Sequence, residues 1–131
     1  MISKTDQYAL RAVLHLAQRV EDGPVGAAAI AQGLGLPANY LSKILHDLAR
    51  AGVLRSERGP RGGFRLAKPA SELSLAEVIA PFNSFMKQRT CLLGREQCSD
   101  ETPCRVHERW SQAADPIIEF FNHTAIADLL E

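Results

Sequence analysis

Apolar residues recur at helical spacing near the start of the chain. Between residues 6 and 20 they form one stripe along a helix face: Ala9, Val13, Leu16, Ala17 and Val20. Tyr8, Leu10 and Leu14 add apolar surface outside this stripe. A surface of this breadth predicts a helix that is covered on more than one side, as at a subunit contact.

Two further helical patterns are separated by a short glycine-containing turn. Residues 27–32 predict a short helix, and GLGLP follows, where Gly33 and Gly35 permit a tight turn and Pro37 suits the start of a new helix. The segment ANYLSKILHDLARAG then ends at Gly52, a position for a left-handed cap. Its apolar residues recur at i, i+3, i+4 and i+7: Leu41, Ile44, Leu45 and Leu48. Two helices joined in this way predict a helix-turn-helix.

Two short strand-like segments follow, VLRSE and FRLAK, joined by RGPRGG at residues 58–63. Gly62 and Gly63 are expected to supply the positive φ angles of a hairpin, and Pro60 to stiffen the loop. Arginines make this hairpin basic: Arg55, Arg58, Arg61 and Arg65. The fold class that follows is mainly α, with a winged helix-turn-helix over residues 1–70.

The helix that begins near residue 38 is the expected recognition helix. The side away from the leucine stripe would enter the major groove with Asn39, Tyr40, Ser42 and Lys43. On the hairpin, the predicted phosphate or minor-groove contacts are Arg55, Arg58 and Arg61. Other roles stay open at this point: Tyr40 packing against the turn, Lys43 touching phosphate alone, and Asn39 capping the helix.

The charge distribution along the chain supports an anionic partner for residues 38–70. The formal net charge is zero, but residues 38–70 hold seven basic and two acidic side chains, a net of +5, and residues 71–131 have a net of −5. No apolar run approaches the roughly 20 residues of a membrane helix, and the N-terminus has no secretory pattern. We therefore expect a cytoplasmic protein without a membrane partner. The chain shows no catalytic signature, so we expect no enzyme.

Residues 71–131 predict a sensor and dimerisation region. The segment SLAE matches a capping box, with Leu73 and Val78 placed for a hydrophobic staple, and Pro81 is expected to kink or end that helix near Ala80.

A long helix from about residue 104 or 107 to residue 122 follows. Its apolar positions are Val106, Trp110, Ala113, Ile117 and Phe121. Pro116 interrupts this pattern, and Asp115 is placed to cap a restarted helix. We expect the helix to pair with its twin in a homodimer; the alternative is that it folds back on its own winged region.

The stretch CLLGREQCSDETPCRVHERW holds all three cysteines. Thiols stay reduced in the cytosol, so a disulfide framework is a poor explanation. The candidate metal ligands are Cys91, Cys98, Cys104 and His107, a set that suits an iron–sulfur cluster or zinc. We expect His107 on the first turn of the long helix, facing the same way as Cys104. Spacing alone leaves three alternatives open, namely a cluster, structural zinc and metal-free thiols, and an exposed, non-ligating His107 is also possible.

Over nearly its whole length the chain resembles the Rrf2 family of bacterial transcriptional regulators. Three features carry the resemblance, in this order: SKTDQYALRAVLHLA, then LPANYLSKILHDLARAGVLRSERGPRGGFRLAKPASELSLAEVI, then three cysteines before a long helix. The resemblance implies a dimeric winged helix that binds double-stranded DNA at a palindromic operator. It also implies that an iron–sulfur cluster on Cys91, Cys98 and Cys104 sets the DNA affinity, as a report of iron, cluster supply, nitric oxide or redox state.

The fourth ligand and the cluster type differ among members of that family. Some use a histidine three residues after the last cysteine, which His107 matches. Others use a carboxylate of the N-terminal helix from the other subunit; here that position is Gln7, and Asp6 beside it is the alternative ligand. Six residues separate Cys91 from Cys98, where known patterns have five. A 2Fe–2S cluster is favoured, and 4Fe–4S is the alternative.

Two other functions explain part of the pattern. A winged-helix regulator with structural zinc or a thiol redox switch accounts for both the hairpin and the cysteines. A small metal or electron carrier accounts for the cysteines but leaves the basic hairpin unexplained.

Overall fold

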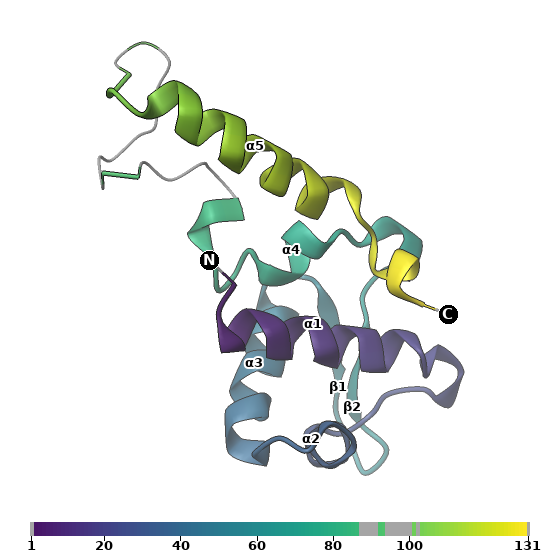
Figure 1. Ribbon diagram of the computed structural model, residues 1–131. Coiled ribbons are helices and arrows are strands. Elements are labelled where there is room, and N and C mark those ends of the chain that lie inside the picture. Colours follow the sequence, from purple (N-terminus) through teal and green to yellow (C-terminus); the bar gives the residue numbers. More distant parts are fainter. Residues whose placement is uncertain (1, 87–91, 94–100, 102, 131) are drawn as a thin grey trace.

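The computed structural model describes residues 2–86, 92–93, 101 and 103–130, and helices dominate these ranges (Figure 1). Their only sheet is an antiparallel hairpin. In chain order the elements are α1 (Lys4–Ala17), η1 (Val20–Asp22), α2 (Ala27–Leu34), α3 (Ala38–Arg50), β1 (Leu54–Glu57), β2 (Gly63–Leu66), η2 (Ala70–Glu72), α4 (Leu75–Ile79), η3 (Ser84–Met86), α5 (His107–His123) and η4 (Ile126–Leu129), where η marks a 3₁₀ helix. The mainly helical winged fold is confirmed.

Helix α1 lies at the centre of the molecule. It begins with a capping box, in which the Ser3 hydroxyl accepts from the Asp6 N–H at 3.1 Å and Asp6 Oδ2 accepts from the Ser3 N–H at 2.9 Å. The helix contacts α2, α3, α4, β2 and η4. Tyr8, Leu10 and Leu14 are partly buried against this core. The broad apolar surface of α1, which suggested a subunit contact, is therefore covered by other parts of the same chain.

The helix-turn-helix forms as predicted. Helix α2 ends on Gly35 at φ 68°, in the left-handed conformation, and the apolar stripe of α3 is buried along its whole length: Leu41, Ile44, Leu45 and Leu48. Gly52 follows α3 at φ 83°, where the Val53 N–H donates to the Leu48 carbonyl at 3.0 Å. Pro37 occupies the cap position of α3 and gives no side-chain cap, so the alternative role of Asn39 as the helix cap is not realised.

The hairpin has two distinct faces. Leu54 pairs with Leu66 and Ser56 with Phe64, whereas Arg55 pairs with Arg65 on the opposite face. Leu54 and Phe64 are buried. The Phe64 backbone also pairs with Val25 on the other edge of β2, through hydrogen bonds of 3.0 and 2.8 Å, so the segment before α2 extends the sheet.

The glycines of the hairpin loop differ from the prediction. Positive φ angles occur at Gly59, 105°, and Gly63, 151°, and not at Gly62. Gly62 is required for space instead, because a Cβ there would lie 2.3 Å from the Glu57 carbonyl oxygen. The expectation for Gly63 is confirmed and that for Gly62 is wrong.

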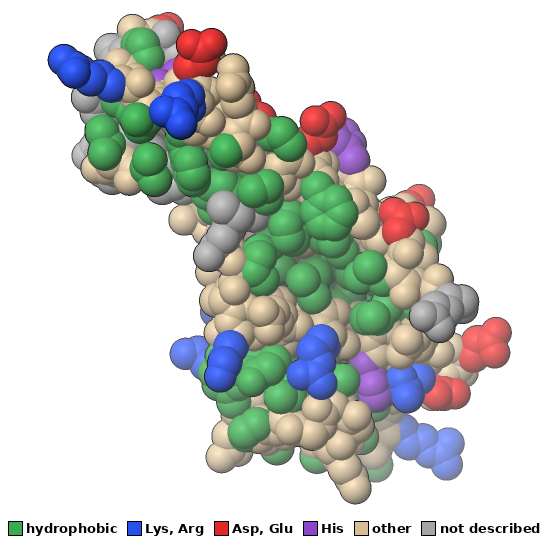
Figure 2. Space-filling view, viewed as in Figure 1, with side chains coloured by type: hydrophobic (Ala, Val, Ile, Leu, Met, Phe, Trp, Pro, Cys, Tyr) green, Lys and Arg blue, Asp and Glu red, His purple; other side chains and the backbone are tan. Residues whose placement is uncertain are grey.

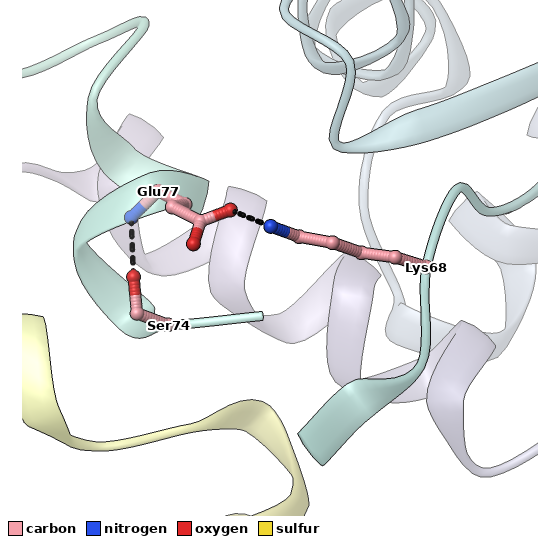
Figure 3. A network of polar contacts seen from close by, with 3 residues as sticks. All are labelled: Lys68, Ser74 and Glu77. Atoms are coloured by element: carbon pink, nitrogen blue, oxygen red, sulfur yellow. Dashed lines mark hydrogen bonds and ion pairs between the residues drawn. The ribbon is translucent and has the colours of Figure 1, made fainter. Parts of the chain in front are cut away.

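Helix α4 has half of the predicted capping box. The Ser74 hydroxyl accepts from the Glu77 N–H at 3.1 Å, but the Glu77 carboxylate forms an ion pair of 2.6 Å with Lys68 (Figure 3). Lys68 follows β2, so this pair joins the exit of the hairpin to α4. The helix ends at Ile79, with Ala80 as its cap, in agreement with the effect expected of Pro81.

Helix α5 is one continuous helix in spite of Pro116, so the predicted restart at Asp115 is wrong. Pro116 and Gln112 are both exposed, and the Gln112 carbonyl, which loses its helical donor, can be hydrated there. The C-terminal half joins the rest of the fold: α5 contacts α4 and η3, and buried Phe121 belongs to the hydrophobic core. The N-terminal half extends away from the winged region (Figure 1).

The last described residues return to the core. The Leu75 N–H donates to the Thr124 carbonyl at 2.9 Å, and the Ile126 N–H donates to the Leu73 carbonyl at 2.8 Å. Ile126 is fully buried. The hydrophobic core therefore joins residues on both sides of position 70.

His15 gives the fold a pH dependence. Burial, and secondarily the nearby Arg19 charge, hold the pKa of His15 below its ordinary value. The unfolded chain takes up this proton below about pH 6.5, while the folded chain resists it, so stability should fall as the pH drops through that range. Replacing His15 by Gln should make the urea midpoint less sensitive to pH between about 5 and 8; an unchanged pH profile would contradict this.

Candidate nucleic-acid interface and cysteine region

The exposed face of α3 is polar and cationic. Four exposed residues lie at i, i+4, i+7 and i+11, opposite the buried leucine stripe: Asn39, Lys43, His46 and Arg50. Ser42 lies beside them and is half-buried. His46 and Arg50 were missed as candidates, although their spacing from Lys43 places them on the same face. The His46 ring packs edge-on against Phe64 of β2 at a centroid distance of 5.2 Å, which joins this face to the hairpin.

Tyr40 is held by α1. Its hydroxyl lies 2.5 Å from the Thr5 hydroxyl, and its ring packs edge-on against Tyr8 at 5.7 Å. The packing alternative is therefore realised, against α1 rather than against the turn. With 41% of its surface exposed, Tyr40 still borders the outer face of α3, but its hydroxyl already has a partner.

The predicted hairpin arginines separate into two groups. Arg58 and Arg61 are exposed in the loop between β1 and β2. Arg55 lies on the hairpin face opposite Phe64, and Phe64 contacts His46 of α3. The structure therefore does not bring Arg55 together with the exposed face of α3.

Replacing both Arg58 and Arg61 by Ala should reduce the salt dependence of DNA binding. For each phosphate that the variant no longer neutralises, the slope of log K against log salt concentration should become shallower by about 0.9, because fewer counterions are released. Fluorescence anisotropy over a salt series measures that slope. Arg109→Ala removes one positive charge from α5, outside the loop, and should leave the slope unchanged. A double variant with the wild-type slope would exclude the loop from the interface.

Cys104 and His107 lie together at the start of α5. The His107 N–H donates to the Cys104 carbonyl at 3.1 Å, and both residues line a hollow of about 690 Å³ that Glu108, Ser111 and Asp115 also border. Cys104 is half-buried and His107 is 7% exposed, so His107 is not the exposed first-turn residue of the alternative expectation. Cys91 and Cys98 lie outside the described residues, and within those described no three His, Cys, Asp or Glu side chains gather at one point.

Asp6 is 1% exposed and lies at the first turn of α1. Its Oδ2 accepts from the Asn83 side-chain amide at 2.8 Å as well as from the Ser3 N–H. Its Oδ1 is buried and accepts no hydrogen bond from the described part of the chain. Asp6 therefore ties the cap of α1 to the segment that leads towards the cysteines, and one of its oxygens has no donor among the described residues.

Comparison with protein families decides the identity. The model of the Rrf2 family, described as an iron-dependent transcriptional regulator, matches residues 2–131. The chain belongs to the Rrf2 family.

Individual Rrf2 relatives cover nearly the whole chain. A protein of Aquifex aeolicus that carries the name of an HTH-type transcriptional regulator is 37% identical over 99% of this chain and 91% of its own length. The regulator IscR of Photorhabdus laumondii is 33% identical over 98% of this chain and 78% of its own length. The solved structure of CymR, titled the global cysteine regulator of B. subtilis, has a TM-score of 0.82 at 27% identity, over 98% of this chain and 95% of that one.

The protein is thus a transcriptional regulator of the Rrf2 type, and DNA is its partner. The winged helix-turn-helix described above is the DNA-binding part of such regulators. Within the ranges that the structure describes, no helix has the length and apolar character needed to cross a membrane.

Proposed function

We propose that this Rrf2 protein is a homodimeric regulator whose DNA affinity is set by an iron–sulfur cluster. The ligands would be Cys91, Cys98, Cys104 and His107. The observation that carries the proposal is the shared hollow of Cys104 and His107 at the start of α5, because a thiolate and an imidazole are donors that suit iron–sulfur clusters. A bound cluster would supply a redox- and iron-sensitive link between the cysteine segment and α5.

The apolar flank of α5 supports the homodimer. Val106, Ala113 and Phe120 share one side of the helix, and Phe120 is 55% exposed. Ile117 on the same side packs partly against the core of its own chain. Figure 2 shows hydrophobic side chains in a band along α5 on the visible face. A contiguous apolar surface of this kind is typical of a contact with a second subunit.

Replacing Phe120 by Glu should weaken the dimer. Removal of an aromatic side chain from the centre of an interface costs about 2 kcal/mol or more, which corresponds to about a thirtyfold increase in the dimer dissociation constant. Light scattering with size-exclusion chromatography over a concentration series measures this. Asn122→Glu introduces the same charge on another face of α5 and should leave the dimer intact; equal behaviour of the two variants would exclude this flank.

A route of contacts joins α5 to the recognition helix. Trp110 of α5 packs against Phe85 of η3 at 6.1 Å. Asn83 beside η3 donates to Asp6 of α1 at 2.8 Å, and Thr5 next to Asp6 holds the Tyr40 hydroxyl of α3. We propose that the cluster acts on α3 through these contacts, which form one continuous network.

The test compares cluster-loaded and cluster-free protein in anaerobic DNA titrations. A coupling of about 1–3 kcal/mol would change DNA affinity about 5–150-fold, and equal affinities would refute cluster control. Asn83→Ala should reduce the difference between the two forms while leaving the iron content unchanged. Loss of iron in that variant would place Asn83 in cluster binding instead of coupling.

A metal-free thiol switch is the second candidate, favoured by the similarity to CymR, the global cysteine regulator of B. subtilis. The anaerobic visible spectrum, with iron and sulfide analysis, separates the candidates. Visible absorption with stoichiometric sulfide supports the cluster. Colourless, iron-free protein whose DNA affinity changes on thiol oxidation supports the switch, and stoichiometric zinc indicates a structural metal.

A further inference from the structure

A second hollow of about 360 Å³ lies between the C-terminal end of α1 and the hairpin. Cationic side chains surround it, namely Arg19, Arg55, Arg65 and Lys68. Its apolar lining includes Leu16, Val20 and Leu66. The volume falls within the range of about 300–1,000 Å³ that small-molecule sites occupy.

The cations of this hollow are incompletely balanced. Arg55 and Arg65 are directly opposite each other on the same hairpin face, an arrangement that is unfavourable for like charges. Arg65 forms an ion pair with Glu57, with 3.2 Å between Arg65 Nε and Glu57 Oε1, although Arg65 Nε makes no hydrogen bond with the described residues. Among those residues, Arg55 has no acidic partner within ion-pair distance.

The remaining two cations are held at the edge of the hollow. Lys68 is paired with Glu77, and Arg19 donates to the His15 carbonyl at 3.1 Å. Their positions are therefore fixed by other parts of the fold, and their charges still contribute to the potential inside the hollow. An anion that entered would meet two guanidinium groups with hydrogen-bonding capacity to spare, those of Arg55 and Arg65.

The hollow is separate from the expected DNA surface. Phe64 faces His46 of α3, so the Arg55 and Arg65 face of the hairpin points away from the recognition helix. The exposed loop arginines Arg58 and Arg61 do not line the hollow. A DNA phosphate at α3 therefore does not account for this cluster of cations.

We propose that this hollow binds a small organic anion, a carboxylate on a short apolar chain. The planar guanidinium groups of Arg55 and Arg65 match a carboxylate through paired hydrogen bonds. The chain would cover Leu16 and Val20, and Val20 is an apolar side chain that is 63% exposed. Such a ligand would join α1 to the hairpin and offset the repulsion between the two arginines. The site is independent of the cluster and of the dimer.

Isothermal titration calorimetry of the full chain with acetate, butanoate and hexanoate tests the site. Each added CH₂ that enters the hollow should tighten binding about threefold to fourfold, and hexanoate should bind more tightly than hexanol, which has the same chain without the charge. Arg55→Gln should weaken hexanoate binding about tenfold or more, because it removes a charge-assisted pair. Arg61→Gln, the same change outside the hollow, should leave binding unaltered.

Several results would overturn the proposal. Absence of saturable binding for all three carboxylates would exclude the site. Inorganic phosphate binding as tightly as hexanoate would exclude a role for the apolar lining. Equal effects of Arg55→Gln and Arg61→Gln on DNA affinity, with no difference in hexanoate binding, would assign Arg55 to the DNA interface.

Discussion

Purified without oxygen, a Cys104→Ala variant should carry little iron and bind operator DNA with the affinity of the cluster-free wild type. An iron–sulfur cluster needs several thiolates around it, and Cys104 is the cysteine that the structure places beside buried His107. Iron and acid-labile sulfide per chain, together with the visible spectrum, measure cluster content. Anisotropy with operator DNA measures affinity. A variant that kept a full complement of iron and sulfide would remove Cys104 from the ligand set.

The same measurements distinguish the two candidate fourth ligands. If His107 is the ligand, His107→Ala should lose cluster while Asp6→Asn keeps it. Asp6→Asn should lower the free energy of unfolding by about 0.5–2 kcal/mol, because Asp6 completes the cap of α1. The reverse pattern, with iron lost from Asp6→Asn alone, would assign the ligand to the buried Asp6 oxygen that has no hydrogen bond from the described residues.

Replacing Gly63 by Ala should lower the free energy of unfolding by about 2–6 kcal/mol. A non-glycine residue at φ 151° costs about 1–3 kcal/mol. The new Cβ would also lie 2.4 Å from the carbonyl carbon and oxygen of Val25, and such overpacking costs about 1–3 kcal/mol more. Urea unfolding followed by circular dichroism measures the decrease.

Gly59→Ala is the matched control for that experiment. Gly59 also has a positive φ, 105°, but a Cβ there meets nothing within 4 Å, so only the cost of the backbone conformation applies. The Gly59 variant should therefore be the more stable of the two. Equal decreases in the free energy of unfolding would show that the backbone at Val25 can shift to accommodate a Cβ at position 63. The close contact between Gly63 and Val25 would then not fix the position of the hairpin.

Local patterns predicted the helix-turn-helix and the hairpin well. The buried stripe of α3 and the turn at Gly35 are set by residues close in sequence, and the structure has them as expected. The same is true of the end of α4 before Pro81. In each case the deciding contacts are within a few residues, so periodicity and turn chemistry are sufficient.

Some of the contacts that the sequence did not reveal join residues of different elements. The cap residue Glu77 binds Lys68, Tyr40 is held by Thr5, which lies 35 positions away, and Asp6 binds Asn83, which lies 77 positions away. Helical periodicity contains no information about such partners. The expectation that Pro116 would interrupt α5 was wrong because this proline is exposed. Water can therefore hydrate the Gln112 carbonyl, which has lost its helical donor.

The candidate site was predicted unevenly. The spacing of Cys104 and His107 was sufficient to place them together, because three residues span slightly less than one turn at a helix start. On the exposed face of α3 the prediction omitted His46 and Arg50, although their helical spacing from Lys43 places them there. Arg55 was assigned by its charge, whereas the alternation of strand faces directs it away from α3.

The burial of Ile126 beside Leu73 has a consequence for how the protein is made. The winged region has been translated in full long before Ile126 leaves the ribosome, yet its core lacks a side chain until that moment. Until Ile126 packs, the nascent chain therefore exposes an apolar surface near α1 and α4. During that interval it is most vulnerable to aggregation and most dependent on chaperones.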